Sequence, residues 1–389
     1  FFFLAWRRVA CFGVCAMAPS SHGPEALLRA MAPIDEVFDA FILSIPGESD
    51  SCSWAQPEVG QVHFAALISR AIAPPFVPTR RYLRLLLTRY ASRMEGEAGC
   101  QVEDETLAEL IAEHAFGPSS SSVVVGSATG GGMGGGDAPD PDANGYVSFQ
   151  LPQQDNGNIV GIRVYPHHND VAIRRVWEAG CCLAEFLLSH PDLIRDKKVI
   201  ELGAGVGLTG IVAAGLCRPM HLHMTDYTEA CLDNMEHSIS VNEDWLHRQG
   251  VNVDGDERCR KLTSGYLEWT ECAECNSENI AAETLTSAPF ELPEAQVLLA
   301  ADVVYDVCQI PDLVRCVKVL LSSSRDAKAI FATPFRNEKT FDLFTNQLHN
   351  EGIVSQFVDN DVIADLPSIF PCYFSQPRSD IRICTMTIE

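Results

Sequence analysis

The sequence predicts an α/β fold with a mostly parallel sheet, preceded by a smaller helical domain. From Tyr146 onward, short apolar runs alternate with helical stretches, an order typical of parallel strands joined by helices. Before that point, residues 61–116 carry apolar side chains at spacings of three and four, as amphipathic helices do. A glycine-rich turn at 203–207 follows the first strand of the alternating part. We therefore expect a helical domain over 31–116 and an α/β domain over 146–389.

The helical domain is expected to contain three helices and to end in a linker. The three helical segments are 61–73, 77–93 and 103–116. The following stretch, 117–145, is rich in Gly, Ser and Pro and has too little apolar surface to offset the entropy lost on ordering. We expect a linker or a disordered insertion there.

In the α/β domain, each apolar run is expected to be a strand and each following stretch a helix. The expected strands are KVIEL (198–202), HLHMT (221–225), QVLLAAD (296–302), AKAIFAT (327–333), IVSQFV (353–358) and IRICTMTIE (381–389). The expected helices are 208–217, 228–241, 309–321 and 339–350. The last two strands are separated by no helix-sized segment of clear period, so we expect them to form an antiparallel closing hairpin.

The composition excludes several classes of protein. With 47% hydrophobic and 21% charged residues, the 389-residue chain is neither wholly disordered nor fibrous. Its 28 Lys and Arg face 52 Asp and Glu, a net charge of −24, and no basic patch stands out, so we expect no direct nucleic-acid partner. No apolar run reaches the roughly 20 residues of a membrane span. Fifteen irregularly spaced Cys indicate reduced thiols, and we expect a cytoplasmic monomer.

The N-terminal segment allows two interpretations. Arg7 and Arg8 precede a short apolar run, as in a signal peptide. The chain also begins with Phe, which suggests a true start at Met17 or Met31. We assign no functional role to this segment.

The sharpest site signal is the glycine-rich turn after the first strand. Gly203, Gly205 and Gly207 alternate with other residues there, and glycine lets a ligand approach the backbone closely. A tight strand-to-helix turn also needs glycine for steric reasons alone. Asp226 ends the second strand 23 residues after Gly203, where an acidic side chain can bind ribose hydroxyls. Capping of the next helix is the alternative role for Asp226.

The residue before the turn favours one nucleoside cofactor over another. Glu201 stands two residues before the first glycine, and a carboxylate there would repel the diphosphate of a dinucleotide. A cofactor with a cationic sulfonium and an amino group tolerates that carboxylate. The sequence therefore favours S-adenosylmethionine over NAD.

Several motifs together carry a resemblance to a known family. They are ELGAGVGLTG at 201–210, Asp226, Leu267-Glu268-Trp269, Asp302-Val-Val-Tyr305, and VWEAGCCLAEFLLSHP at 176–191. In this combination the chain resembles the seven-β-strand protein-lysine methyltransferases, whose hallmark after the fourth strand is Asp-x-x-Tyr. The N-terminal helices and the Arg336-Asn337 loop make the branch that methylates elongation factor 2 the nearest match. The resemblance is firm over 146–389 and looser over 61–116.

The resemblance implies a Rossmann-like sheet of seven strands with an antiparallel final strand, and it implies site residues. Trp177 would cover the cofactor, Asp226 would hold its ribose, and the backbone of Gly203, Ala204 and Gly205 would run under its methionine part. Glu268 and Trp269 would flank the adenine, with Ala301 beside it. An adenine requires an aromatic or apolar face and a few polar partners, which agrees with these residue types. Core packing is the alternative role for both tryptophans.

The resemblance places the catalytic residues at the end of the fourth strand. Asp302 and Tyr305 lie at the carboxyl end of that strand, the edge where ligands bind in open α/β sheets. We expect Asp302 to attract and orient a lysine ammonium and Tyr305 to shape a narrow apolar channel that lowers the pKa of the amine. The alternative is that Asp302 caps the next helix and Tyr305 packs in the core.

Charge around this edge supports a cationic substrate. No Lys or Arg occurs between Lys261 and Arg315, while ten acidic residues fall in the gap: Glu268, Glu271, Glu274, Glu278, Glu283, Glu291, Glu294, Asp302, Asp306 and Asp312. An acidic rim there could steer a basic protein surface, whereas a solvated acidic loop is the alternative. Long stretches at 243–260 and 270–295 lie near the site, and the single CxxC at 272–275 lacks a partner pair, so we expect no metal.

These features predict a protein-lysine N-methyltransferase that uses S-adenosylmethionine and acts on elongation factor 2. Methylation of another protein or of a small molecule is one alternative. A cofactor-binding interaction module without turnover is the other.

Overall fold

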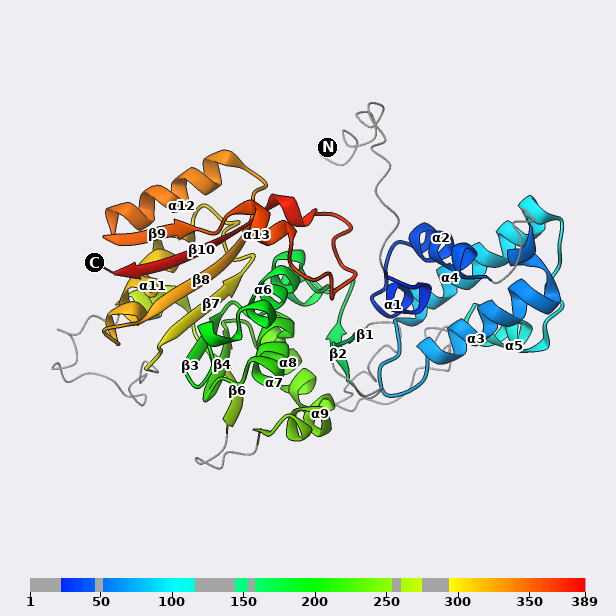
Figure 1. The fold of residues 1–389 in the computed structure, drawn as a ribbon, viewed down its shortest axis with the longest axis horizontal. Helices are drawn as coiled ribbons and strands as arrows, with labels where there is room; N and C mark the ends of the chain where they lie inside the picture. The colour runs from blue at the N-terminus through cyan, green and yellow to red at the C-terminus, as the bar shows by residue number, and fades with distance from the viewer. Residues whose placement is uncertain are drawn as a thin grey trace, which may run out of the picture.

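The computed structural model describes residues 22–45, 52–115, 144–152, 158–253, 260–274 and 294–388. A cluster of helices lies beside an α/β domain (Figure 1). Nearly all of the expected linker, and the N-terminal segment through residue 21, lie outside the described residues. Among the described residues, no helix is both long enough and apolar enough to cross a membrane.

The helical part packs around an aromatic core. Its helices are α1 (Pro24–Arg29), α2 (Ile34–Ser44), α3 (Val62–Ala71), α4 (Arg80–Arg93) and α5 (Glu105–His114). The last three agree with the predicted helices, whereas α1 and α2 were not predicted. Side-chain caps set two of the starts: Thr79 accepts from the Tyr82 N–H, and Asp104 accepts from the Leu107 N–H. The rings of Phe64 and Tyr90 stack with centroids 3.8 Å apart.

The sheet of the α/β domain has eight strands in the order β5-β6-β4-β3-β7-β8-β10-β9. They are β3 (Lys198–Leu202), β4 (His221–Asp226), β5 (Val251–Asn252), β6 (Arg260–Tyr266), β7 (Val297–Ala301), β8 (Lys328–Pro334), β9 (Ile353–Phe357) and β10 (Ile381–Ile388). Strand β10 runs antiparallel to both β8 and β9, and the other pairs are parallel. The mostly parallel sheet and its antiparallel closing hairpin are therefore confirmed. Two strands were not among the six located from the residues: β6, which brings the number to the seven that the resemblance implies, and β5, two residues long at the edge.

Helices cover both faces of this sheet. They are α6 (Glu178–Ser189), α7 (Leu208–Cys217), α8 (Glu229–Val241), α9 (Glu243–Arg248), α10 (Trp269–Glu274), α11 (Ile310–Ser322), α12 (Glu338–Asn350) and α13 (Asn360–Ala364). On β7, Leu299 packs into the core under α6, α7 and α8, while Leu298 and Ala300 pack under α10, α11 and α12. This alternation buries both faces, as a parallel sheet requires.

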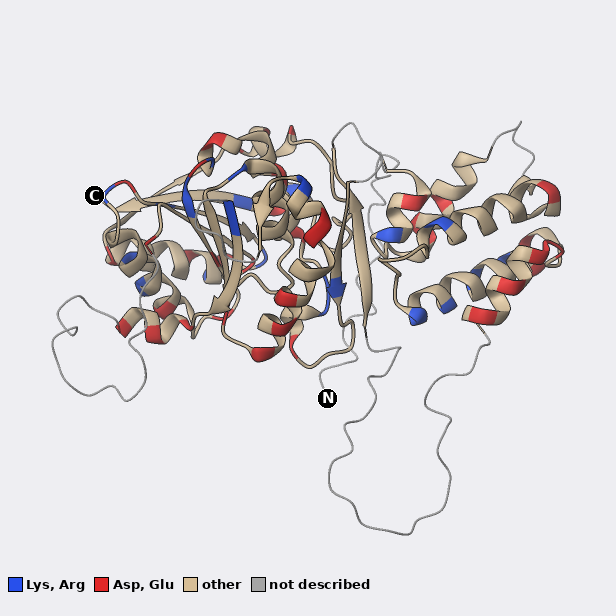
Figure 2. Ribbon diagram, turned by 90° about the horizontal axis from the view of Figure 1, so that it is seen from below, with Lys and Arg blue, Asp and Glu red and all other residues tan. Residues whose placement is uncertain are grey.

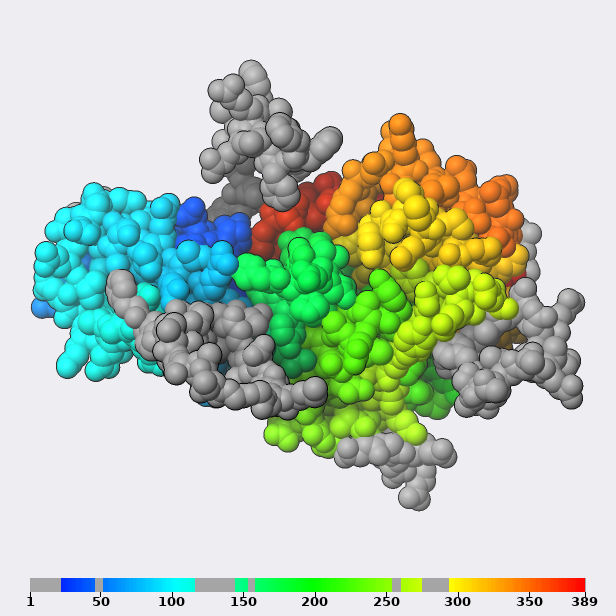
Figure 3. Space-filling view, turned by 180° about the vertical axis from the view of Figure 1, so that it is seen from behind, coloured from blue at the N-terminus to red at the C-terminus, as the bar shows by residue number. Residues whose placement is uncertain are grey.

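A hairpin that the sequence did not predict lies between the two parts (Figures 1 and 3). It consists of β1 (Gly145–Gln150) and β2 (Ile159–Val164), paired antiparallel. The Tyr146 N–H donates to the Val77 carbonyl at 2.9 Å, and the Phe76 ring fills the space where Gly161 lacks a side chain. On its other side, Asn242 bonds both the N–H and the carbonyl of Gly161. The hairpin thus joins the helical part to the α/β domain.

Candidate functional site

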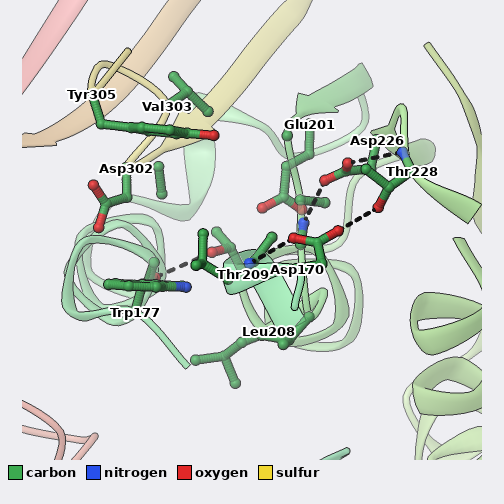
Figure 4. A pocket seen from close by; sticks show the side chains of 18 of the residues that line it. Asp170, Trp177, Glu201, Leu208, Thr209, Asp226, Thr228, Asp302, Val303 and Tyr305 are labelled. Carbon is green, nitrogen blue, oxygen red and sulfur yellow. Dashed lines mark hydrogen bonds between the residues drawn. The ribbon is translucent and has the colours of Figure 1, made fainter. Parts of the chain in front are cut away.

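A cavity of about 240 Å³ opens at the carboxyl ends of β3, β4 and β7. Nine of the ten predicted site residues line it: Trp177, Gly203, Ala204, Gly205, Asp226, Trp269, Ala301, Asp302 and Tyr305 (Figure 4). The tenth, Glu268, lines an adjoining cavity of about 70 Å³ together with Asp226 and Trp269. The fold therefore collects in one place residues that are more than 120 positions apart in the chain.

The glycine-rich turn has a backbone that few other residues adopt. Gly203, Gly205 and Gly207 have φ angles of +61°, +55° and +81°. A Cβ on Gly203 would lie 2.8 Å from the Val303 side chain and 3.4 Å from the Trp269 ring. Glycine is therefore required both by the backbone of the turn and by the side chains packed against it, which supports the steric interpretation; the ligand-binding role stays a prediction.

Asp226 ties the glycine turn to β4. Its carboxylate accepts from the Gly205 N–H at 3.0 Å and from the Tyr227 N–H at 2.8 Å. Burial raises the pKa of this carboxyl group, and the backbone donors, Gly205 first, act in the opposite direction. The N-cap of α8 is Thr228, which accepts from the Cys231 N–H, so the capping role considered for Asp226 belongs to Thr228.

Glu201 is the most unusual ionisable group in the cavity wall. Its side chain is buried, and its Oε2 atom has no hydrogen-bond partner. Burial raises its pKa from 4.5 to about 8, although the nearby Thr209 hydroxyl and Gly210 N–H partly oppose the rise. Glu201 is one of the residues that line the cavity, so a cationic group bound there would favour the ionised form of its carboxyl group.

The two predicted tryptophans both line the cavity. Trp269 begins α10 beside Gly203 and lines both cavities. Trp177 stands just before α6, and the Arg175 guanidinium lies 4.3 Å from its ring centroid. Both rings are only half-buried, so neither is a plain core residue.

Asp302, Tyr305 and Trp177 lie on the side of the cavity away from Asp226 and Thr228 (Figure 4), and we call this side the mouth because Tyr305 is exposed there. Asp302 has a left-handed backbone, with φ +58°. Tyr305 is 57% exposed, and α11 has Gln309 rather than Asp302 at its N-cap. The capping and core-packing alternatives for this pair are therefore wrong. Their catalytic roles stay predictions.

Arg336 is the main site residue whose role the sequence did not indicate. Its two terminal nitrogens donate to the two Asp302 carboxylate oxygens at 2.6 and 2.7 Å. It follows β8, 34 positions after Asp302, and lines the same cavity. The Arg336-Asn337 loop was noted only as part of the resemblance, because no local spacing connects an arginine with an aspartate on another strand.

Asp170 is a second cavity residue that the sequence analysis missed. One of its oxygens accepts from the Ala172 N–H at 2.9 Å, and the other accepts from the Thr228 hydroxyl at 2.8 Å. It lies in an irregular segment between β2 and α6, where no periodic pattern exists to single it out.

The predicted acidic rim is only partly at the cavity. Glu268 and Asp312 line the adjoining cavity. Glu294, by contrast, pairs with Lys198 at 2.8 Å at the opposite, amino ends of β3 and β7. Glu278, Glu283 and Glu291 lie outside the described residues. Acidic residues also occur in both parts of the molecule (Figure 2), so they are not confined to this edge of the sheet.

No group of three or more His, Cys, Asp or Glu side chains that could hold a metal occurs in the part of the chain that the structure describes. Within the CxxC at 272–275, Cys272 is buried, and Cys275 lies outside the described residues.

Comparison with known proteins finds lysine methyltransferases among the proteins similar to this chain. Residues 162–350 match the family described as lysine methyltransferase. Among curated relatives, protein-lysine N-methyltransferase EEF2KMT of Bos taurus is 26% identical over 54% of this chain and 60% of that protein. The human protein of the same name is 26% identical over 46% of this chain and 50% of its own length. Protein-lysine N-methyltransferase EFM3 of Chaetomium thermophilum is 27% identical over 44% and 45%.

These matches cover roughly half of the length of the curated relatives, from 45% to 60%. Among solved structures, a ribosomal protein L11 methylase from Lactobacillus delbrueckii subsp. bulgaricus aligns with 10% identity and a TM-score of 0.32, over 53% of this chain and 77% of that one.

Proposed function

We propose that the chain is a protein-lysine N-methyltransferase that uses S-adenosylmethionine. The observation that carries the proposal is one continuous cavity. It has the glycine turn and Asp226 at one side, and Trp177, Asp302 and Tyr305 at its mouth. A cofactor held on the turn would therefore present its reactive end to the mouth. The family of residues 162–350 supports the same activity.

The residues present fit this cofactor. The unpartnered Oε2 of Glu201 suits a cationic amino group, which would also stabilise the ionised carboxylate. Asp226 lies in the cavity wall beside the glycine turn, where its carboxylate is placed to meet ribose hydroxyls, and the half-buried Trp269 offers a face for a purine. When bound, S-adenosylmethionine would supply an activated methyl group on a sulfonium centre.

The chain's own contribution to methyl transfer would be alignment and exclusion of water. An in-line displacement on a methyl group requires little covalent work from the protein, so most of the acceleration comes from positioning. The attacking lysine amine must be neutral, although its ordinary pKa is about 10.4. A narrow mouth walled by Trp177 and Tyr305 disfavours the ammonium and so lowers that pKa.

For the substrate we propose elongation factor 2. The support is the set of relatives named EEF2KMT, together with the N-terminal helices that accompany the catalytic domain. Another protein or a small molecule is the rival substrate. A cofactor-binding module without turnover is the rival from a different class.

Incubation of the full chain with methyl-labelled S-adenosylmethionine and a cell lysate separates these proposals. We expect one labelled band at the mass of elongation factor 2, and label on the purified factor. A labelled band of another mass would overturn elongation factor 2 as the substrate but would support protein methyltransferase activity. Label in low-molecular-mass material would favour the small-molecule enzyme. Binding of the cofactor without transfer would favour the module, and no calorimetric heat with the cofactor or its demethylated product would overturn the whole proposal.

A further inference from the structure

The mouth of the cavity contains an ion pair that changes what Asp302 can do. Both oxygens of Asp302 are bonded by Arg336 in a two-pronged arrangement, and the Asp302 side chain is only 9% exposed. Such paired charge-assisted bonds are among the strongest side-chain contacts. An incoming lysine ammonium would have to share this carboxylate with a fixed guanidinium, because each oxygen already accepts one Arg336 N–H. Asp302 is therefore not a free acceptor.

Arg336 is held in place from several sides. The Phe335 N–H donates to the Asp380 carbonyl at 2.7 Å, and the Arg336 N–H donates to Pro334 at 3.0 Å. Asn337, the next residue, caps α12 by accepting from the Lys339 N–H. The loop that carries the guanidinium is thus anchored before and after Arg336.

The same guanidinium reaches the aromatic wall. It lies 5.8 Å from the ring centroid of Trp177, whose ring also has Arg175 at 4.3 Å. The Asp302 backbone is fixed as well, since its N–H donates to the Ala332 carbonyl at 3.0 Å. Arg336 therefore links the end of β7, the end of β8 and the start of α6 around the mouth.

Other charged and titratable groups face this pair from the surrounding elements. Glu178 from α6 acts on Arg336 directly, and Arg175 shares the Trp177 ring with it. The others line the same cavity or lie beside Tyr305: Asp170 from the segment before α6, Glu201 from β3, Asp226 and Tyr227 from the end of β4, and Tyr305 and Asp306 from the loop after β7. Glu178 is already engaged by Arg175 and by Ser375. Proximity to Asp302, and to a lesser extent Glu178, raises the pKa of Arg336, so the guanidinium stays charged.

We propose that Arg336 is a positioning residue that neutralises Asp302 and fixes it beside Trp177, so that the mouth accepts the target amine in its neutral form. This inference rests on the proposed methyltransferase function and deepens it. An unpaired Asp302 would stabilise the ammonium and oppose the loss of its proton. Paired with Arg336, Asp302 can still orient the amine by a hydrogen bond, but the pair adds almost no net charge.

The pH dependence of kcat at saturating elongation factor 2 tests this, because it reports pKa values in the enzyme–substrate complex. Arg336→Met leaves Asp302 unpaired, and we expect the alkaline rise of kcat to move up by about 1 pH unit or more. Asp302→Asn leaves Arg336 unpaired, and we expect a shift in the opposite direction. Arg336→Lys keeps the positive charge but loses the bidentate contact with Asp302. We therefore expect kcat to fall, while the pH of its alkaline rise stays within a few tenths of a unit of that of the unaltered protein.

The matched control is Arg382→Met. Arg382 lies beside Phe335, bonds the Ser379 carbonyl, and does not line the cavity, so its loss should leave the profile unchanged. Calorimetric binding of S-adenosylhomocysteine to each variant verifies that the site is folded.

A lowered kcat with an unshifted profile in Arg336→Met would overturn the proposal and leave Arg336 a purely structural role. A downward shift in that variant would also overturn it. If the unaltered protein transfers no methyl group to any acceptor, it is the proposed function that fails. That result is visible before any variant is made.

Discussion

The two parts of the molecule bury different kinds of side chain. The helical part has a core of stacked aromatic rings, and its buried polar side chains among the described residues are Gln61 and Thr79. Gln61 uses its whole amide, donating to two carbonyls and accepting from two N–H groups. The α/β domain instead buries four carboxylates: Glu178, Glu185, Glu201 and Asp226.

Two of these carboxylates, Glu185 and Glu201, differ in how many hydrogen bonds they make. Glu185 on α6 is bonded by Arg378, by the Tyr373 hydroxyl and by two backbone N–H groups of 369–370, so it fixes the C-terminal loop. Glu201 leaves its Oε2 without a partner at the cavity. A buried charge with all its bonds made is structural, whereas one with unused capacity at a cavity indicates a ligand. Among the described residues, the unpartnered buried carboxylate thus lies in the α/β domain, at the cavity, and not in the helical part.

The largest expected effect is on the stability of the helical part. Phe64→Ala should lower its free energy of unfolding by about 3–5 kcal/mol, because it removes a fully buried ring stacked on Tyr90. Denaturant unfolding, monitored through hydrogen exchange of the amides in α1–α5, measures this change in the free energy of unfolding. Val62→Ala on the same helix, 45% exposed, is the control and should change little. A large loss of cofactor affinity in folded Phe64→Ala protein would show that the helical part contributes to the cofactor site.

The second effect is on turnover. Asp302→Ala should reduce methyl transfer at least about 100-fold, because the amine loses its orienting partner and Arg336 is released. Affinity for S-adenosylhomocysteine, measured by calorimetry, should stay within a few fold. Near-normal turnover in this variant would show that the role assigned to Asp302 is wrong.

The third effect is on cofactor affinity. Trp269→Ala should weaken binding of S-adenosylhomocysteine by about 10-fold, since base–aromatic stacking contributes roughly 1–3 kcal/mol. Stability should change less than in Phe64→Ala, because the Trp269 ring is only half-buried. The exposed neighbour Thr270→Ala is the matched control. Equal affinities in the two variants would remove Trp269 from the cofactor site.

The smallest expected effect is on the pH dependence of stability, through protonation of Glu201. Its folded pKa of about 8 lies above its ordinary 4.5, so its contribution to stability is full below pH 4.5 and is lost as the pH rises through 8. Glu201→Gln should remove this loss from the pH dependence of unfolding.

Cofactor binding gives a second measurement on the same residue. A cationic amino group beside Glu201 should expel its proton near pH 7, up to about one per ligand bound. Calorimetry in two buffers of different ionisation enthalpy detects this release. Glu201→Gln should abolish it, whereas Glu268→Gln, in the adjoining cavity, should not. Release that persists in Glu201→Gln would assign the proton to another group.

Local sequence was sufficient for the framework. The spacing of apolar residues predicted α3, α4, α5 and six of the eight strands of the described sheet, because periodicity reflects which face of an element is buried. The glycines at 203–207 located the turn, since its left-handed backbone nearly excludes other residues. Parallel strands present their carboxyl ends at one edge, so the sequence by itself was enough to assign Asp226 and Asp302 to the same site.

Only the tertiary structure shows which side chains at that site are paired and which are buried without a partner. The β1–β2 hairpin obtains its place from contacts with both parts of the molecule. The pairing of Asp302 with Arg336 and the unpartnered Oε2 of Glu201 depend on which side chains meet across separate strands. Sequence spacing encodes periodicity within an element. Charge and desolvation depend on distances between elements, which only the folded chain sets.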